Sequence, residues 1–275
     1  MMLRKANVII IGAGDKGTSI ALRMYRSGFR PVLIERNNPT DLHSFRNYSD
    51  TVYLGRKQID DIECLLTHLG ADNADRFTEI EQVKSDRKLP ILRQDQFEAL
   101  NALDPDIIID CRGKIHSEQQ FEWEQYPCVI RIGNQYRVGS DGHFIIGDSD
   151  TALGRVLVAE SQESMERRSE DYISCSPLEG IFIAEADVGS RITEKETVGT
   201  INDIKIMAPR NGLLTGMLHS GHFVAVRQPL FEIYPERLAD RNRKVIPNTC
   251  WAIAGGVLEA ALTFITENEK LFAGR

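Results

Sequence analysis

The alternation of apolar and polar positions divides the chain into a part with long buried strands and a part with short ones. Val8 to Ile11 and residues 106–110 are runs of apolar residues that predict strands buried on both faces. Apolar residues at 20, 21, 24 and 25 share one face of a predicted helix, which Gly28 ends. Pro31 to Ile34 then predicts a second strand. Strand, helix and strand in this order are typical of a parallel sheet.

The same periodicities predict further elements along the chain. Strands are expected at 51–55, 79–83, 89–92, 128–133, 143–147 and 155–159, and helices at 59–69, 94–103 and 248–267. We expect the strands of 128–159 to form an antiparallel annex to the parallel sheet. Residues 160–172 are polar and charged, and they predict a linker or exposed loop.

Two glycines lie inside the predicted C-terminal helix. Gly255 and Gly256 would each cost about 1 kcal/mol relative to alanine in a helix interior. Such a cost indicates either close backbone packing at these positions or a helix that begins there and faces an anion. Because the β-rich region before it does not need this helix, we expect it to return to the first domain.

Residues 174–236 have a different character, with short strand-like pieces between glycine and proline turns. Two sub-segments in this region share one scheme, in which a proline and a glycine precede two β pairs joined by a glycine turn. Their offset is Pro177 to Pro209. A twofold β repeat of this kind predicts a small sandwich in which each half covers the apolar face of the other.

Composition narrows the class of protein. The 275 residues are 42% hydrophobic and 27% charged, which is typical of a globular protein, and the length suggests two domains. The formal net charge of −7 argues against binding to nucleic acid or to an anionic membrane. No apolar run reaches the roughly 20 residues of a membrane span. The five scattered cysteines, without a C-x-x-C, favour a reduced cytoplasmic protein with neither a disulfide framework nor a zinc site.

The first strand runs directly into a G-x-G-x-x-G motif, formed by Gly12, Gly14 and Gly17 with Asp15 inside it. Gly12 allows the tight turn, Gly14 allows the backbone to approach a pyrophosphate, and Gly17 allows the helix to pack closely on the strand. The helix N-terminus offers N–H groups and a positive dipole end to a phosphate. The pattern predicts a bound nucleotide; a glycine turn with only a structural role is the alternative.

Glu35 and Arg36, which directly follow the second predicted strand, bear on which nucleotide the turn would bind. Glu35 lies where an acid takes the ribose hydroxyls, and its carboxylate would repel a 2′-phosphate, which favours NAD over NADP. Arg36 weakens that preference, since it could pair with the phosphate or lie on the adenine. S-adenosylmethionine and flavin nucleotides also use such turns. We therefore predict NAD or another nucleotide.

The buried run at 106–110 ends in a second group of polar candidates. Ligands of open α/β sheets lie at the carboxyl ends of strands, which makes Asp110 and Arg112 candidates for the pocket. A salt bridge at the end of the strand is the alternative. Cys111 between them could be a thiolate nucleophile or a buried, inert thiol, and no histidine with a supporting motif is near in sequence.

With these residues in view, the chain resembles the selenium-dependent molybdenum hydroxylase system proteins, which are accessory proteins of molybdenum hydroxylases. The resemblance rests on the segment from the glycine motif to Glu35 and on the segments YSDTVYLG, IIIDCRGK, LGRVLVAE and AIAGGVLEA. It implies a Rossmann-like N-terminal part and a role in maturing or supplying a molybdenum hydroxylase. The chain departs from the family at Gly133-Asn134-Gln135 and at residues 148–152.

The region 174–236 resembles the biotinyl/lipoyl hammerhead, or barrel-sandwich hybrid. Lys205 lies inside a strand-like run and no Met-Lys-Met is present, so we expect no covalent biotin or lipoate. The fold class predicted from these observations is α/β. It comprises a Rossmann-like doubly wound sheet (1–160), a small all-β barrel-sandwich hybrid (174–236) and a C-terminal helix (245–275) that packs back on the first domain.

Three functions compete at this point. The first is an accessory protein that binds a nucleotide and assists a molybdenum hydroxylase or its cofactor-assembly proteins. The second is an NAD(P)-dependent oxidoreductase that uses Asp110, Arg112 or Cys111, for which the sequence shows no positioned acid or base. The third is a carrier modified at Lys205. Homo-oligomers are compatible with each of them, and whether the protein is an enzyme stays open.

Overall fold

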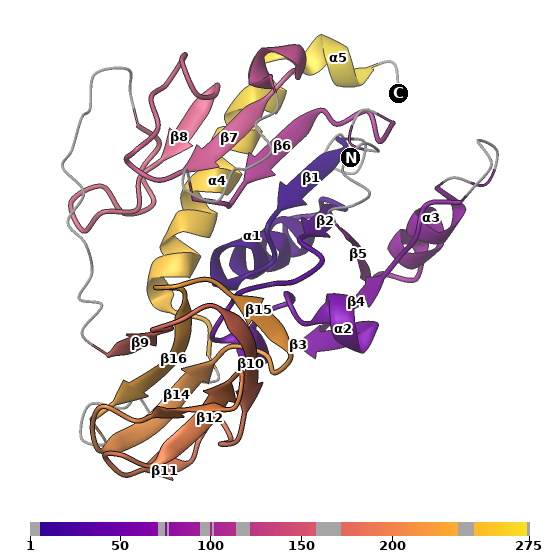
Figure 1. The fold of residues 1–275 in the computed structure, drawn as a ribbon. Coiled ribbons are helices and arrows are strands. Elements are labelled where there is room, and N and C mark those ends of the chain that lie inside the picture. Colours follow the sequence, from indigo (N-terminus) through magenta and orange to yellow (C-terminus); the bar gives the residue numbers. More distant parts are fainter. Residues whose placement is uncertain are drawn as a thin grey trace. The chain divides into compact units, whose positions relative to one another are not determined.

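The computed structural model describes residues 6–70, 75, 77–93, 100, 102–113, 122–157, 172–235 and 245–273. Contacts within the chain divide it into two compact units (Figure 1). Unit 1 comprises Met1–Asn37, Asn47–Glu166 and Ile246–Arg275, and unit 2 comprises Asn38–Arg46 and Arg167–Val245. Unit 2 therefore takes up a short segment that lies, in sequence, inside unit 1.

The strands described in unit 1 form one eight-stranded sheet. In spatial order they are β3 (Arg56–Ile59), β4 (Ile62–Leu66), β5 (Leu89–Arg93), β2 (Val32–Glu35), β1 (Val8–Ile11), β6 (Ile107–Asp110), β7 (Val129–Ile132) and β8 (Phe144–Ile146). All neighbours pair in parallel except β3 and β4. Strands β1 and β6, at the centre, are buried along their whole length, as their unbroken apolar sequences predict.

Two long helices cover part of this sheet. Helix α1 (Asp15–Arg26) packs against α4 (Asn248–Glu267), and α4 also contacts β7 and β8. A Cβ on Gly256 would lie 2.1 Å from the carbonyl oxygen of Gly154, whereas one on Gly255 would meet only Arg23 Nη1 at 3.8 Å. The predicted close backbone packing is therefore confirmed at Gly256. The predicted return of this helix is seen in its contacts with α1.

Helix α4 is long and apolar enough to cross a membrane by length and composition alone. Half of its apolar window is buried inside the protein. Its buried residues belong to the same hydrophobic core as those of α1 and β1. Packing within unit 1 therefore accounts for its apolar character, as in the core helix of a globular protein.

Several elements differ from those predicted. Residues 56–66 form the β3–β4 hairpin instead of a helix, residues 51–54 form the short helix α2 (Thr51–Leu54), and residues 78–85 form α3 (Thr78–Ser85). The apolar residues of β4 fit the two-residue period of a strand as well as the period of a helix. Pairing with β5 selects the strand. The expected antiparallel annex is wrong, because β7 and β8 extend the sheet in parallel. Most of the predicted helix 94–103 and the linker 160–171 lie outside the described residues.

The strands described in unit 2 form two four-stranded antiparallel sheets. One has the order β13 (Ile204–Met207), β12 (Thr197–Ile201), β10 (Gly180–Ala184) and β15 (His222–Val224). The other has the order β11 (Arg191–Ile192), β14 (Gly212–Met217), β16 (Pro229–Tyr234) and β9 (Ile173–Cys175). Phe182, Phe231 and Leu214 are fully buried in the core of this unit.

The two halves of the sequence repeat exchange one strand each. The first half keeps β10 and β12 in one sheet and gives β11 to the other, while the second half keeps β14 and β16 together and gives β15 to the first sheet. Each sheet therefore contains strands from both halves. The tip of the β12–β13 hairpin is fixed by Asn202, which donates to the carbonyl of Glu179 and fills the space beside Gly180.

The predicted fold class is wrong. Unit 1 contains a mixed sheet with an antiparallel edge, and its connection from β2 to β5 carries a hairpin and two short helices instead of the single covering helix that a Rossmann-like doubly wound sheet requires. Unit 2 consists of two antiparallel sheets and includes Asn38–Arg46, which the predicted barrel-sandwich hybrid does not. The predicted boundaries at 160 and 236 fall outside the described residues, so they stay predictions.

Candidate functional site

The glycine-rich turn between β1 and α1 has the backbone geometry that its sequence predicts. Gly12 has a φ of +93°, and its N–H donates to the carbonyl of Ile34 at 2.8 Å. A Cβ on Gly17 would lie 1.8 Å from the carbonyl oxygen of Gly12. Gly17 thus allows α1 to pack directly on the turn, and Gly14, in the N-cap position, makes no side-chain cap.

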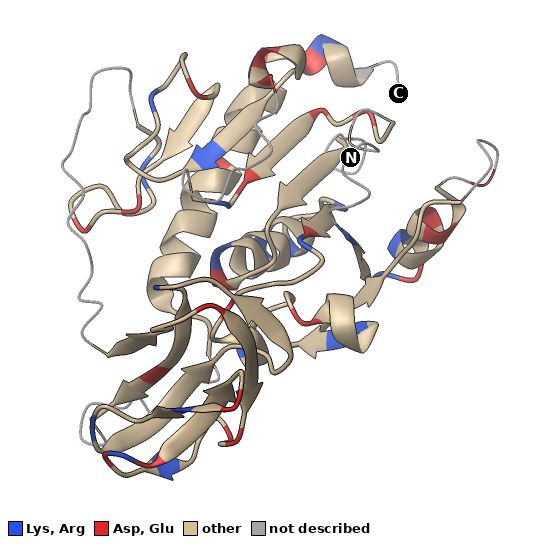
Figure 2. Cartoon of the chain, in the orientation of Figure 1, with Lys and Arg blue, Asp and Glu red and all other residues tan. Residues whose placement is uncertain are grey.

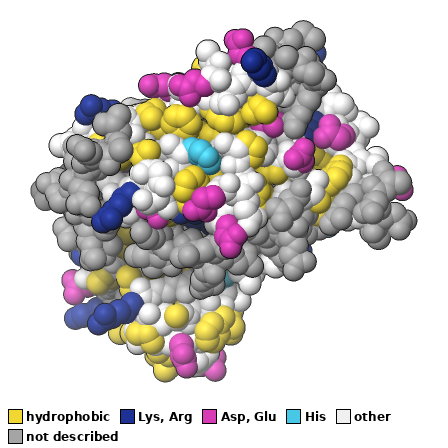
Figure 3. Space-filling model, turned by 90° about the horizontal axis from the view of Figure 1, so that it is seen from above, with side chains coloured by type: hydrophobic (Ala, Val, Ile, Leu, Met, Phe, Trp, Pro, Cys, Tyr) yellow, Lys and Arg dark blue, Asp and Glu magenta, His cyan; other side chains and the backbone are white. Residues whose placement is uncertain are grey.

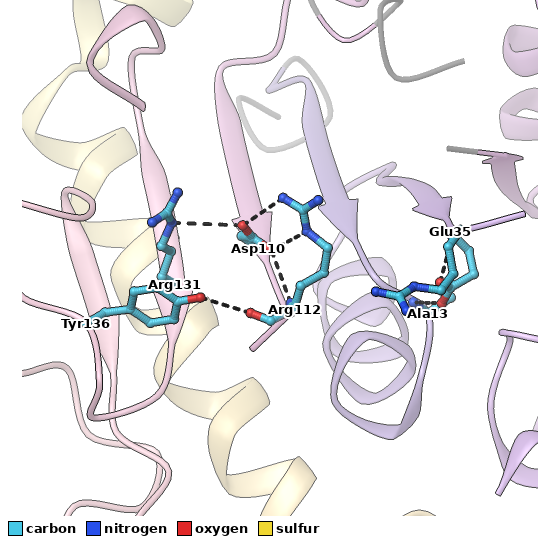
Figure 4. Close-up of polar contacts among 7 residues, drawn as sticks. Ala13, Glu35, Asp110, Arg112, Arg131 and Tyr136 are labelled. Carbon is cyan, nitrogen blue, oxygen red and sulfur yellow. Dashed lines mark hydrogen bonds and ion pairs between the residues drawn. The ribbon is translucent and has the colours of Figure 1, made fainter. Parts of the chain in front are cut away.

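Glu35 closes one side of this turn. Its carboxylate accepts hydrogen bonds from the N–H of Ala13 and from the N–H of Arg36, both at 2.7 Å (Figure 4). Glu35 is buried, whereas Arg36 is partly exposed. The Glu35 carboxylate therefore fixes the backbone of the turn. Its predicted contact with a ribose, and the predicted role of Arg36, stay predictions.

Asp110, at the carboxyl end of β6, is the centre of a buried polar network. It is fully buried, and it holds Arg112 through Nε at 3.0 Å and Nη2 at 3.1 Å. Arg131, from β7, reaches the same carboxylate at 3.9 Å and stacks on the ring of Tyr136. Burial raises the pKa of Tyr136 to about 12, and its hydroxyl donates to the carbonyl of Arg112 at 3.1 Å. Figures 2 and 4 show the opposite charges side by side at these strand ends.

This network adjoins the glycine-rich turn. A Cβ on Gly12 would lie 3.5 Å from Cβ of Cys111 and 3.7 Å from Cγ of Arg112. The salt bridge that was the alternative interpretation of Asp110 and Arg112 is present. The same contact places Arg112 next to the turn, while the predicted ligand pocket stays a prediction.

Lys16, in the first turn of α1, belongs to a second polar group on the rim of the turn. Its Nζ lies 2.9 Å from Oδ2 of Asp148, which follows β8. Asp148 and Asn134 exchange two hydrogen bonds, from the N–H of each to the side-chain oxygen of the other. Asn134 also donates to the hydroxyl of Ser149 at 2.9 Å. The loops after β7 and β8 are thereby joined into one rim that Lys16 reaches.

Two further candidates have structural partners. Asp15 accepts a hydrogen bond from the side-chain amide of Asn47 at 3.0 Å. Burial, followed by the nearby charge of Asp110, raises the pKa of the Cys111 thiol well above its usual range. Because a thiolate is the nucleophilic form, this shift disfavours a nucleophilic role for Cys111.

Sequence reasoning missed four members of the site: Lys16, Arg93, Arg131 and Asp148. Arg93 ends β5 opposite Glu35, and its guanidinium donates to the carbonyl of Val52 at 2.7 Å. Arg93 and Asp148 could have been found from the rule that placed Asp110, since each directly follows a predicted strand, whereas Arg131 lies inside one. Lys16 lies inside the glycine motif itself.

The described residues contain no group of three or more His, Cys, Asp or Glu side chains that could hold a metal ion. On the face shown in Figure 3, basic side chains of the described residues are scattered singly among apolar, neutral and acidic ones. The chemistry that the described site offers is therefore hydrogen bonding from backbone amides, guanidinium groups and one ammonium group.

Comparisons with known proteins identify few relatives. No family model matches the chain. An uncharacterized protein, YqeB of Escherichia coli K12, is 24% identical over 273 residues, which is 96% of this chain and 48% of the relative. The chain thus spans about half the length of the curated relative that it matches.

The solved structures that resemble this chain do so weakly. A succinylglutamate desuccinylase/aspartoacylase from Rhodobacter sphaeroides is 13% identical, with a TM-score of 0.24, over 75% of this chain and 58% of that one. The ectoine utilization protein EutE from Ruegeria pomeroyi is 11% identical, with a TM-score of 0.26, over 83% of this chain and 86% of that one. Likeness at this level carries no conclusion about the activity of this chain.

The expected membership in the molybdenum hydroxylase accessory family is wrong. No family model matches, and neither YqeB nor the solved structures reported above are described as molybdenum proteins. The accessory role, which rested on this membership, and the alternative of an NAD(P)-dependent oxidoreductase are wrong as well, because the Rossmann-like sheet on which both were based is not the sheet of unit 1. The motifs that carried the resemblance are short strand–turn–helix and buried-strand segments, which parallel sheets of many functions share.

Proposed function

We propose that the protein binds a small molecule with a phosphate group, a nucleotide being the class to test first, at the glycine-rich turn. The observation that carries this proposal is the first turn of α1. It begins after Gly14 with no side-chain cap, and Arg112 lies next to the turn that precedes it. Amides of an uncapped first turn and the helix dipole both favour an anion.

The residues around the turn supply the remaining contacts. The side chain of Arg112 is held by Asp110, so its planar group is preorganised to bind an oxyanion. Lys16 is about one-third exposed, which allows a ligand to reach it. A lysine ammonium has three donors, so Lys16 can bind a phosphate oxygen while it keeps its ion pair with Asp148.

Isothermal titration calorimetry of the full chain with pyrophosphate, AMP and ADP tests the proposal. We expect saturable binding of at least ADP, which weakens as salt is added because the contacts are ionic. Lys16→Gln should weaken it about tenfold, since a hydrogen bond to a charged group contributes about 1.5–3 kcal/mol. Lys88→Gln is the matched control, because Lys88 pairs with Glu63 at 2.9 Å with nearly the same exposure. Absence of saturable heat with all three compounds would overturn the proposal.

We also propose a cytoplasmic location. All five cysteines are free, and three of them, Cys64, Cys128 and Cys250, are buried. Free thiols in this number are typical of a reducing compartment. Alkylation of the denatured protein, purified from its own host under conditions that trap thiols, should label all five residues. A disulfide in that material would contradict the proposed location.

A further inference from the structure

The segment Asn38–Arg46, which we call the strap, belongs by its contacts to unit 2 although its flanking residues belong to unit 1. Leu42 is buried in the hydrophobic core of unit 2. Its carbonyl oxygen accepts a hydrogen bond from the N–H of Met217, at the end of β14, at 2.8 Å. The strap is thus attached to a sheet whose strands begin more than 120 residues later in the chain.

A polar cluster fastens the strap to β14 and β16. Nε2 of His43 lies 3.0 Å from the carboxylate of Glu232, which also accepts from the hydroxyl of Thr215 at 2.6 Å. Burial would raise the pKa of Glu232, but the hydrogen bonds from His43 and Thr215 outweigh it and hold the pKa below its usual value. The buried carboxylate therefore favours the attached position of His43.

The sheet is adapted to receive the strap. The register of β14 against β16 shifts between Leu214 and Gly216, which is a bulge at Thr215. A Cβ on Gly216 would lie 2.9 Å from Nε2 of His43 and 3.0 Å from the carbonyl oxygen of Leu42. The glycine thus leaves room for the strap, and the bulge accompanies the hydrogen bond from Thr215 to Glu232.

The residues that flank the strap on either side make hydrogen bonds within unit 1, to the glycine-rich turn and to α1. Glu35, three residues before the strap, accepts from the N–H of Ala13. Asn47, the first residue after it, donates to Asp15, and the next N–H, of Tyr48, donates to the hydroxyl of Thr18. Only Arg36 and Asn37 separate Glu35 from Asn38, the first residue of the strap, and the three steps between their Cα atoms span at most about 11 Å. A larger displacement of the strap must therefore move Glu35 or break its hydrogen bonds.

We propose that the strap couples the glycine-rich turn to the β14–β16 face, so that ligand binding at the turn and attachment of the strap favour each other. The part that concerns a ligand rests on the function proposed above, whereas the coupling between strap and turn does not. The two states are the strap attached to Glu232 and the strap released. Because coupling is reciprocal, release of the strap must lower the affinity for the ligand by the same factor by which the ligand shifts the strap toward its attached state.

Two variants release the strap from the side of unit 2. His43→Ala combined with Glu232→Gln removes the fastening hydrogen bond and the buried charge, and Gly216→Ala drives a methyl group against the strap. Neither change touches the turn. Glu194→Gln is the control, because Glu194 is an exposed carboxylate of the same unit. Circular dichroism and thermal melting establish that each variant is folded. If the double variant does not fold, Gly216→Ala alone provides the test.

Hydrogen exchange without ligand is the first measurement. We expect the amides of Ala13 and Tyr48 to exchange about fivefold faster or more in both release variants, which is the lower end of typical coupling. We expect no change in Glu194→Gln. Unchanged exchange at both amides in a folded variant whose strap amides exchange faster would overturn the proposal.

Calorimetry with ADP is the second measurement. The release variants should bind ADP about fivefold more weakly, and ADP should slow exchange of the strap amides in the wild type. Normal ADP affinity in a released variant overturns the coupling while the proposed function stands. If the wild type does not bind ADP, pyrophosphate or AMP, the proposed function fails, and the exchange of Ala13 and Tyr48 alone decides whether the strap and the turn are coupled.

Discussion

Two regions of this protein each bury a carboxylate, and they stabilise it in different ways. Asp110, at the carboxyl end of the central strand β6, is fully buried and held by the guanidinium of Arg112, with Arg131 nearby. Glu232, in unit 2, is 13% exposed and is held by an imidazole and a hydroxyl. A guanidinium carries its charge at every pH that a protein survives, whereas a hydroxyl carries none.

The difference separates a fixed site from an adjustable attachment. The partners of Asp110 are permanent, so the strand ends that adjoin the glycine-rich turn stay preorganised when conditions change. The partners of Glu232 come from the strap and from a bulged strand, and one of them, His43, leaves when the strap is released. The predictions below test this contrast.

The largest effect is expected from Asp110→Asn. The variant leaves Arg112 buried without its carboxylate, and breaking a buried pair from one side costs about 3 kcal/mol. Glu232→Gln should cost clearly less at pH 7, because Glu232 is partly exposed and its hydrogen bonds come from an imidazole and a hydroxyl, with the charge of Arg46 a smaller influence. Urea unfolding of both variants measures the two values. Equal losses would remove the distinction between the two carboxylates.

The second prediction compares Gly17, which lies at the glycine-rich turn, with Gly216, which lies against the strap. Gly17→Ala would put a methyl group 1.8 Å from a backbone carbonyl that cannot move away, so we expect a loss of about 2 kcal/mol. Gly216→Ala meets the edge of the His43 ring, and the strap can give way, so we expect about 1 kcal/mol. Thermal unfolding ranks the two variants. A larger loss at Gly216 would mean that the strap is the more rigid of the two.

The third prediction concerns acid. The pKa of Glu232 is lowered in the folded protein, so its contribution to stability is complete above the unfolded value of 4.5 and is lost as pH falls through the lower folded value. The wild type should therefore lose more stability between pH 5 and pH 3 than Glu232→Gln does. Glu194→Gln is the control and should follow the wild type. Parallel curves for the wild type and Glu232→Gln would show that Glu232 does not take part in acid unfolding.

The smallest effect on stability is expected from Lys16→Gln. The pair with Asp148 is about one-third exposed and partly screened by water, so its loss should cost less than about 1 kcal/mol, and the cost should shrink further in salt. The same variant should reduce ligand affinity strongly, as described above. A large loss of stability with unchanged affinity would assign Lys16 to the architecture of the rim instead of to binding.

Local sequence patterns predicted the core of unit 1 well. The strands at Val8–Ile11 and Ile107–Asp110 and the helices α1 and α4 lie where the apolar patterns place them. The close approach at Gly17 followed from the motif alone. These features are set by neighbours within about 20 residues, or by burial on both faces, and both leave a clear trace in the sequence.

Long-range pairing was not predictable in the same way. The hairpin of β3 and β4 carries apolar residues that fit a helix as well as a strand, and only the neighbouring β5 resolves the ambiguity. His43 was not predicted as a functional residue because its partner Glu232 is 189 positions away. Arg131 lies inside a predicted strand, and its role depends on Asp110, which lies on a different strand.

The exchange of β11 and β15 between the halves of unit 2 has a consequence for how that unit can be divided. A cut in the tight turn at Asn202 and Asp203 would leave two peptides, and each would own strands of both sheets but a complete version of neither. Neither fragment could therefore complete either sheet without the strands of the other.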